Sequence, residues 1–111
     1  MKMIGNLYES NEKKILDLGY SDGFGTYYVT EQAKSVLSVD FNKEAIEYAK
    51  MFNRCHNIDF NLENFLNKRY GDFDGIVSFD TIEHIYPENQ KDYMKTVIMN
   101  LNVGGIYCRN S

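Results

Sequence analysis

Long apolar runs are missing from this 111-residue sequence. No window approaches ~18 consecutive apolar residues, the length that a membrane span needs. The first residues, MKMIGNLYES, lack the apolar core of a signal peptide. Cysteine is scarce too, because Cys55 and Cys108 stand far apart and form no CxxC pair. We therefore expect a cytoplasmic protein with reduced thiols, no membrane span and no metal or redox motif built on cysteine.

Basic clusters are also absent. The formal net charge is −4 and the pI is near 5.1, and Lys and Arg stand singly or in pairs such as Lys68 and Arg69. This gives no electrostatic reason to expect nucleic-acid binding, although net charge alone does not exclude an RNA or DNA substrate. Repeats, linkers and low-complexity segments are lacking as well. We expect one domain, residues 13–111, after a short N-terminal segment, residues 1–12.

The most informative stretch is KKILDLGYSDGFGT, residues 13–26. Its short apolar run predicts a buried strand, which breaks into a glycine loop and then leads into a helical pattern. Backbone N–H groups in such a loop, with a helix N-terminus behind them, favour an anionic ligand group. Asp17 is an acid in an otherwise apolar strand. We expect it to accept hydrogen bonds from loop N–H groups or to meet a ligand cation.

The glycine spacing argues against a dinucleotide site. A GxGxxG fingerprint that began at Gly23 would need a glycine in place of Tyr28. One that began at Gly19 would need a glycine in place of Ser21. Taken alone, the loop also leaves open an ordinary strand-to-helix turn without a ligand.

The rest of the sequence alternates between strand and helix patterns. Strands are predicted at 34–40, 58–60, 74–79 and 104–111, and a short helix at 26–32. A helix capped by Asn42 is predicted to run to about Phe52, and another to span 87–101 before a break at 102–105. This order predicts an α/β fold, a Rossmann-like doubly wound parallel sheet of about five strands that binds ligands at the strands' carboxyl ends. The expected inward helix faces are Ala45, Ile46, Ala49 and Phe52, and Tyr93, Met94, Val97, Ile98 and Leu101.

The glycine loop resembles the first motif of the class I S-adenosylmethionine-dependent methyltransferases. That motif has an acid, any residue, and then alternating glycines, which Asp17, Gly19 and Gly23 match. The resemblance implies S-adenosylmethionine as cofactor, with Asp17 at its ammonium group and the loop at its carboxylate. Tyr20 stands where the family commonly has a small residue, and Ser21 where it has glycine. Both add bulk where the methionine part of the cofactor would lie.

Two later segments extend the resemblance. Asp40 lies ~20 residues after the loop, where a carboxylate can accept hydrogen bonds from both hydroxyls of a ribose. The family uses this acid for the cofactor ribose and often packs the next residue, here Phe41, on adenine; a helix-capping role for Asp40 is the alternative. IDFNLENF, residues 58–65, resembles the segment that reads the adenine amino group. Asn64 is the expected reader, Glu63 is second, and a plain surface turn is the alternative.

FDGIVSFDTIEHIYP, residues 73–87, resembles the fourth-strand motif of small-molecule methyltransferases such as those of quinone biosynthesis. Phe79 is an expected cofactor contact at the end of the strand. His84 is expected to act as a general base or as a wall of the acceptor pocket, and packing beneath the sheet is its alternative. Asp80, Glu83 and His84 could converge on a divalent metal, as a similar ExxEH does in some relatives. The RNA-modifying enzymes among these need a further His, so we predict no metal site.

LNVGGIYCRNS, residues 101–111, resembles the leucine and double-glycine turn before the family's fifth strand. Family members usually continue through another helix and two more strands, which this sequence lacks. Without them the fifth strand would be an open edge that invites pairing, so a homo-oligomer is expected.

The resemblance runs from residue 13 to the end of the chain. It implies a methyltransferase, or the cofactor-binding core of one, with a small-molecule acceptor. The alternative is a non-catalytic relative that keeps the fold to bind a nucleoside or a partner chain. Tyr20, Ser21 and the missing C-terminal strands favour that alternative.

Overall fold

The computed structural model describes residues 13–19, 33–52, 57–78 and 87–109. Its strands are β1 (Lys14–Leu18), β2 (Ser35–Asp40), β3 (Ile58–Leu62), β4 (Phe73–Ser78) and β5 (Leu101–Arg109). Its helical elements are α3 (Lys43–Phe52), the 3₁₀ turn η2 (Pro87–Asn89) and α4 (Gln90–Asn100). Within these residues no helix has the length and hydrophobicity needed to span a membrane.

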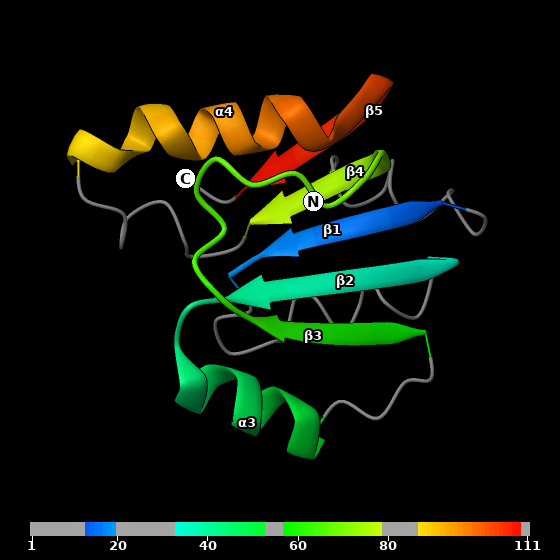
Figure 1. Ribbon diagram of the computed structural model, residues 1–111. Coiled ribbons are helices and arrows are strands. Elements are labelled where there is room, and N and C mark those ends of the chain that lie inside the picture. Colours follow the sequence, from blue (N-terminus) through cyan, green and yellow to red (C-terminus); the bar gives the residue numbers. More distant parts are fainter. Residues whose placement is uncertain (1–12, 20–32, 53–56, 79–86, 110–111) are drawn as a thin grey trace.

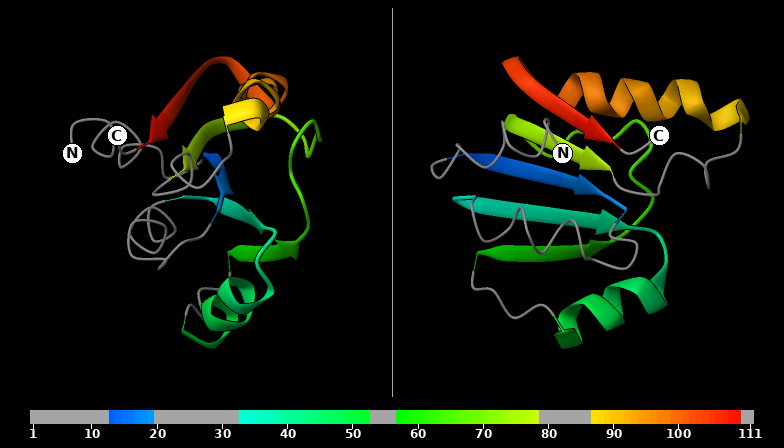
Figure 2. Two further views of the ribbon diagram at one scale, coloured as in Figure 1. Left: turned by 90° about the vertical axis from the view of Figure 1, so that its left-hand side faces the viewer. Right: turned by 180° about the vertical axis from the view of Figure 1, so that it is seen from behind.

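The five strands form one parallel sheet in the order β3-β2-β1-β4-β5 (Figure 1). Strand order reverses at β1, because β2 and β3 lie on one side of it and β4 and β5 on the other. The predicted α/β doubly wound sheet is therefore confirmed. Ligands of such sheets bind outside the carboxyl ends of the strands, beside the reversal. The left view of Figure 2 looks onto those ends.

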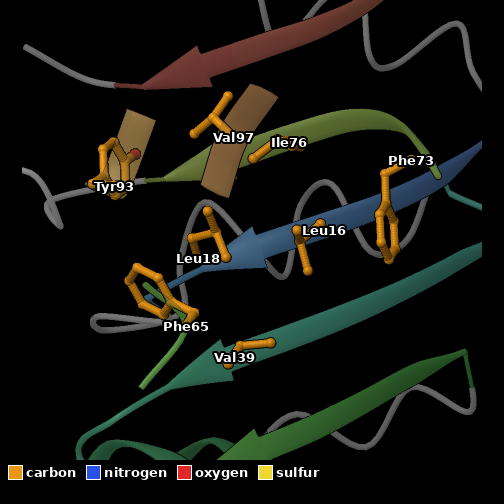
Figure 3. Close-up of a cluster of buried hydrophobic side chains, with 8 residues drawn as sticks. All are labelled: Leu16, Leu18, Val39, Phe65, Phe73, Ile76, Tyr93 and Val97. Atoms are coloured by element: carbon orange, nitrogen blue, oxygen red, sulfur yellow. The ribbon is translucent and has the colours of Figure 1, made fainter. Parts of the chain in front are cut away.

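The sheet is apolar on both faces, as a parallel sheet covered by helices must be. One face carries a buried cluster that Ala49 of α3 joins, and its strand members are Ile15, Val36, Ile58, Val77 and Cys108. The opposite face carries a second cluster that includes Tyr93 and Val97 of α4 (Figure 3). The other members are Leu16, Leu18, Val39, Phe65, Phe73 and Ile76. The helices α3 and α4 thus cover opposite faces.

Helix α3 begins where the sequence predicts. Asn42 Oδ1 accepts hydrogen bonds from the backbone N–H groups of Glu44 at 2.9 Å and of Ala45 at 3.3 Å. This is the usual geometry of an N-cap, which satisfies N–H groups that have no partner inside the helix. Ile46 and Ala49 are buried, which confirms the predicted inward face, although the side chain of Phe52 lies outside the described part.

The bounds of β2, β3, β4 and β5 differ from the prediction, for β3 and β5 because of strand pairing. β3 continues to Leu62 because it stays in register with β2 as far as Asp40. β4 starts at Phe73, and β5 starts at Leu101 rather than at residue 104. The helix ends at Asn100, before the predicted break at 102–105, but this stretch belongs to β5. It forms a register shift between the Phe73–Leu101 and Gly75–Ile106 pairs of β4 and β5.

The inward face of α4 also differs from the prediction. Tyr93 and Val97 are buried as expected, but Met94 and Ile98 are 38% and 72% exposed. The remaining buried positions on this helix are polar, Thr96 and Asn100. Apolar periodicity could not reveal them, because their burial depends on partners in another segment.

Gly105 has no room for a side chain. A Cβ atom there would lie 2.7 Å from Leu101 Cδ1, 2.9 Å from Asn102 O and 3.0 Å from Asp74 O. Gly105→Ala is expected to lower the free energy of unfolding by about 1–3 kcal/mol, because two backbone oxygens would have to move. Urea denaturation measures this change. Val103→Ala, at a fully exposed position of the same strand, is the control and should stay within about 0.5 kcal/mol. Equal losses in the two variants would contradict the steric explanation.

Candidate functional site

Asp17 is completely buried in β1, two residues before Gly19. Its Oδ2 accepts a hydrogen bond of 2.6 Å from Ser38 Oγ, and the two residues are register partners in β1 and β2. A buried carboxylate is costly unless it is hydrogen-bonded, so Ser38 both stabilises and orients this acid. Ser38 is not among the predicted site residues. Its signal in the sequence is a hydroxyl group inside a mainly apolar strand, two residues before Asp40.

Gly19, which directly follows β1, has a backbone conformation that favours glycine. Gly19 has φ = 84°, a left-handed conformation that glycine adopts without strain, and its N–H donates to Val39 O at 2.7 Å. On the other side of β1, Ser78 Oγ donates to Leu18 O at 3.0 Å. The carboxyl end of β1 is thus tied to both neighbouring strands.

Asp40 ends β2 and is only 7% exposed. Its Oδ1 accepts a hydrogen bond of 2.9 Å from the N–H of Asn42, and Asn42 itself caps α3. Asn42 rather than Asp40 is therefore the N-cap residue of α3, and the Asp40 carboxylate holds the backbone of that cap residue. The backbone oxygen of Asp40 accepts a bond of 2.9 Å from the N–H of Glu63, which brings the turn after β3 to the same strand end.

An aromatic pair lies beside this strand end. Phe41 directly follows Asp40 and is 56% exposed, whereas Phe65 is fully buried. Their ring centroids are 6.1 Å apart, with the planes tilted by 48°. Phe65 thus packs against one side of the Phe41 ring, and more than half of the Phe41 surface stays exposed to solvent.

The turn after β3 places Asn64 in an exposed position, with its Oδ1 accepting from the N–H of Leu66 at 3.0 Å. The carboxylate of Glu63 forms an ion pair instead, with its Oε2 3.1 Å from Lys68 Nζ. This hydrogen bond from Lys68 lowers the pKa of the Glu63 carboxyl group, against a smaller opposing effect of burial. Burial, together with the neighbouring Glu63 carboxylate, raises the pKa of the Tyr70 phenol. Asn64 is the more exposed of the two candidate readers, and its Oδ1 has a second lone pair for a further donor.

The structure brings together the predicted site residues that it describes. Asp17, Gly19, Asp40, Phe41 and Asn64 all lie at or near the carboxyl ends of β1, β2 and β3. The other predicted residues lie outside the described part of the chain. These are Tyr20, Ser21, Gly23, Phe79, Asp80, Glu83 and His84.

The described residues at this edge of the sheet include three acids. Asp17, Asp40 and Glu63 lie at or near adjacent strand ends, and Lys68 is the cation paired with one of them. A ligand that combines a positive charge with hydroxyl donors suits these carboxylates.

Solved structures share this fold at low sequence identity. PKMT2 from Rickettsia typhi, solved in complex with AdoHcy, is 26% identical with a TM-score of 0.76, over 97% of this chain and 23% of that one. PH0226 from Pyrococcus horikoshii is 24% identical with a TM-score of 0.78, over 88% and 48%. DhpI, solved as a complex with SAH, is 18% identical with a TM-score of 0.77, over 96% and 54%. The chain thus spans about half the length of two of these proteins and less of the third.

A search of curated proteins gives no significant match. A family model described as a methyltransferase domain, however, matches residues 15–105. The match begins in β1, ends in β5, and contains both buried strand-end acids. This chain therefore belongs to the methyltransferase-domain family, and the resemblance to class I S-adenosylmethionine-dependent methyltransferases is confirmed.

Proposed function

We propose that this chain is the cofactor-binding part of an S-adenosylmethionine-dependent methyltransferase with a small-molecule acceptor. The observation that carries the proposal is the pair of buried carboxylates, Asp17 and Asp40, beside the left-handed turn at Gly19. Relatives solved with SAH or AdoHcy share the fold, which supports the same ligand class.

The residues at the strand ends fit the parts of this cofactor. Asp17 would supply the counter-charge for the ammonium group, and Asp40 would accept hydrogen bonds from the ribose hydroxyls. Phe41 would pack its open ring surface on adenine, and Asn64 would read the adenine amino group. Gly19 lets the backbone approach the ligand closely. The bound cofactor supplies an activated methyl group.

The chain's own chemical task is then mainly one of orientation. Holding the acceptor in line and excluding water supply most of the advantage in such a transfer. For a hydroxyl acceptor, His84 is proposed to take up the proton.

Ligand-dependent thermal stability tests the proposed function. A ligand present at a hundred times its dissociation constant stabilises the folded state by about 2.7 kcal/mol. S-adenosylmethionine and S-adenosylhomocysteine should therefore raise the Tm, whereas NAD should not, because the loop lacks the dinucleotide glycine spacing. Stabilisation by NAD alone would refute the proposal.

A non-catalytic nucleoside-binding or partner-binding module is the second candidate, since Tyr20 and Ser21 replace smaller residues of the family pattern. If their bulk obstructs the methionine end, Ser21→Gly together with Tyr20→Ala should tighten S-adenosylmethionine binding and leave adenosine binding unchanged. Competition binding with the two ligands measures this. Equal effects on both ligands would contradict the obstruction.

We also propose that the protein self-associates through β5 or α4. β5 is an edge strand of the described sheet with Val103 fully exposed, and α4 exposes Met94 and Ile98. Light scattering should give a mass above 13.0 kDa that rises with protein concentration. A constant monomer mass would contradict the proposal.

A further inference from the structure

The connection from β3 to β4, residues 63–72, passes in front of the sheet on the side of α4 (Figure 1). Thr96 of α4 is fully buried against it. The Thr96 Oγ1 atom accepts a hydrogen bond of 2.7 Å from the N–H of Asn67. Its own proton has two acceptors in reach, Phe65 O and Asp92 O, each at 3.0 Å.

Asn100, one helical turn further along α4, forms hydrogen bonds with the second half of this connection, residues 68–71. Its Oδ1 accepts from the N–H groups of Tyr70 at 2.6 Å and Gly71 at 3.3 Å. Its Nδ2 donates to Lys68 O and to Thr96 O, both at 2.8 Å. The side-chain amide is fully buried, and both its oxygen and its nitrogen are used.

Together Thr96 and Asn100 satisfy backbone groups at residues 65, 67, 68, 70 and 71. Two apolar side chains could fill the same space, but they would leave those backbone groups unpaired. A fully satisfied buried network imposes one geometry on the segment that it contacts. The two residues therefore fix the course of the connection as well as fill the core.

Phe65 is where this network meets the candidate site. Its backbone oxygen accepts from Thr96, and its buried ring lies 6.3 Å from the ring of Tyr93 and 6.1 Å from that of Phe41. Asn64 directly precedes it. The turn is therefore fixed at one end by Phe65 and at the other by the bond from Glu63 N to Asp40 O.

We propose that Thr96 and Asn100 are positioning residues that set the selectivity of the cofactor site for adenine. They act through Phe65 on the turn that carries Asn64, and they do not touch the ligand. The inference rests on the proposed function, in which Asn64 reads the adenine amino group.

The test compares S-adenosylhomocysteine with its analogue in which oxygen replaces the adenine amino group. Calorimetry gives a dissociation constant for each ligand, and their ratio measures adenine selectivity. Thr96→Val keeps the shape of the side chain but removes the hydroxyl. It is expected to reduce the ratio by roughly threefold to tenfold, the worth of one hydrogen bond, mostly through weaker binding of S-adenosylhomocysteine. Thr96→Ser keeps the hydroxyl and should retain the wild-type ratio.

Val97→Ala is the matched control, since Val97 is buried on the same helix and packs in the apolar cluster (Figure 3). It should lower stability and leave the selectivity ratio unchanged. If Thr96→Val does not fold, Thr96→Ala takes its place. The smaller side chain leaves room for a water molecule that can pair with Asn67 N–H and Phe65 O, the two backbone groups that lose the hydroxyl.

An unchanged ratio in the hydroxyl-free variant would overturn the proposal, as would an equal fall in Val97→Ala. Wild-type protein that binds both ligands equally well would overturn it too, because adenine would then not be read. Wild-type protein that binds neither ligand would instead refute the proposed function, and the inference with it.

Discussion

Asp17→Asn will bind S-adenosylmethionine roughly tenfold to a hundredfold more weakly than wild type, yet its free energy of unfolding will stay equal or rise. The loss follows because a hydrogen bond to a charged group is worth about 1.5–3 kcal/mol. The retained stability follows because Asp17 is completely buried, and a neutral amide of the same shape avoids the cost of burying a carboxylate. Calorimetric titration and urea denaturation measure the two quantities.

Adenosine separates this effect from a general loss of the site. It lacks the methionine part of the cofactor, so its affinity should be the same in Asp17→Asn and in wild type. A variant that loses stability and affinity for both ligands together would show that Asp17 is only a structural partner of Ser38.

Asp40→Ala should weaken the binding of both S-adenosylmethionine and adenosine, each by roughly tenfold to a hundredfold. Both ligands carry the ribose whose hydroxyls Asp40 is proposed to hold, and a bond to a charged acceptor is lost in each case. The same titrations measure this result. Unchanged affinity in a folded variant would refute the ribose assignment.

Asn42→Ala is the matched control for Asp40. It removes the N-cap of α3 and should lower stability by about 0.5–2 kcal/mol. It retains the Asp40 carboxylate and the backbone N–H that Asp40 accepts from. Ligand affinity equal to wild type is expected, and an affinity loss like that of Asp40→Ala would mean that the whole strand end, rather than the carboxylate, determines binding.

The sheet and the positions of the described candidate residues could be predicted because their signals are local. Apolar runs bounded by glycine or acid, such as those that end at Gly19 and Asp40, are typical of parallel strands buried on both faces. The carboxyl ends of parallel strands meet at one edge of the sheet, so Asp17 and Asp40 were expected to lie together. The N-cap at Asn42 was equally local, because a cap and its partners are at most three residues apart.

The features that escaped prediction depend on contacts distant in sequence. Thr96 and Asn100 look like solvent-facing positions of α4, and only their bonds to a segment about thirty residues earlier explain their burial. Leu101 continues the apolar periodicity of the helix, but its pairing with Phe73 makes it the first residue of β5. Ser38 is a further example, because its hydrogen bond to Asp17 depends on the pairing of β1 with β2.

Isothermal titration of the wild-type chain with S-adenosylhomocysteine tests the central claim most directly, since cofactor binding is what the proposed function assigns to these strand ends. One saturable site is expected, with weaker binding in Asp17→Asn and Asp40→Ala and unchanged binding in Asn42→Ala. Folded wild-type protein that shows no saturable binding up to millimolar ligand would contradict the assignment of these strand ends as a cofactor site.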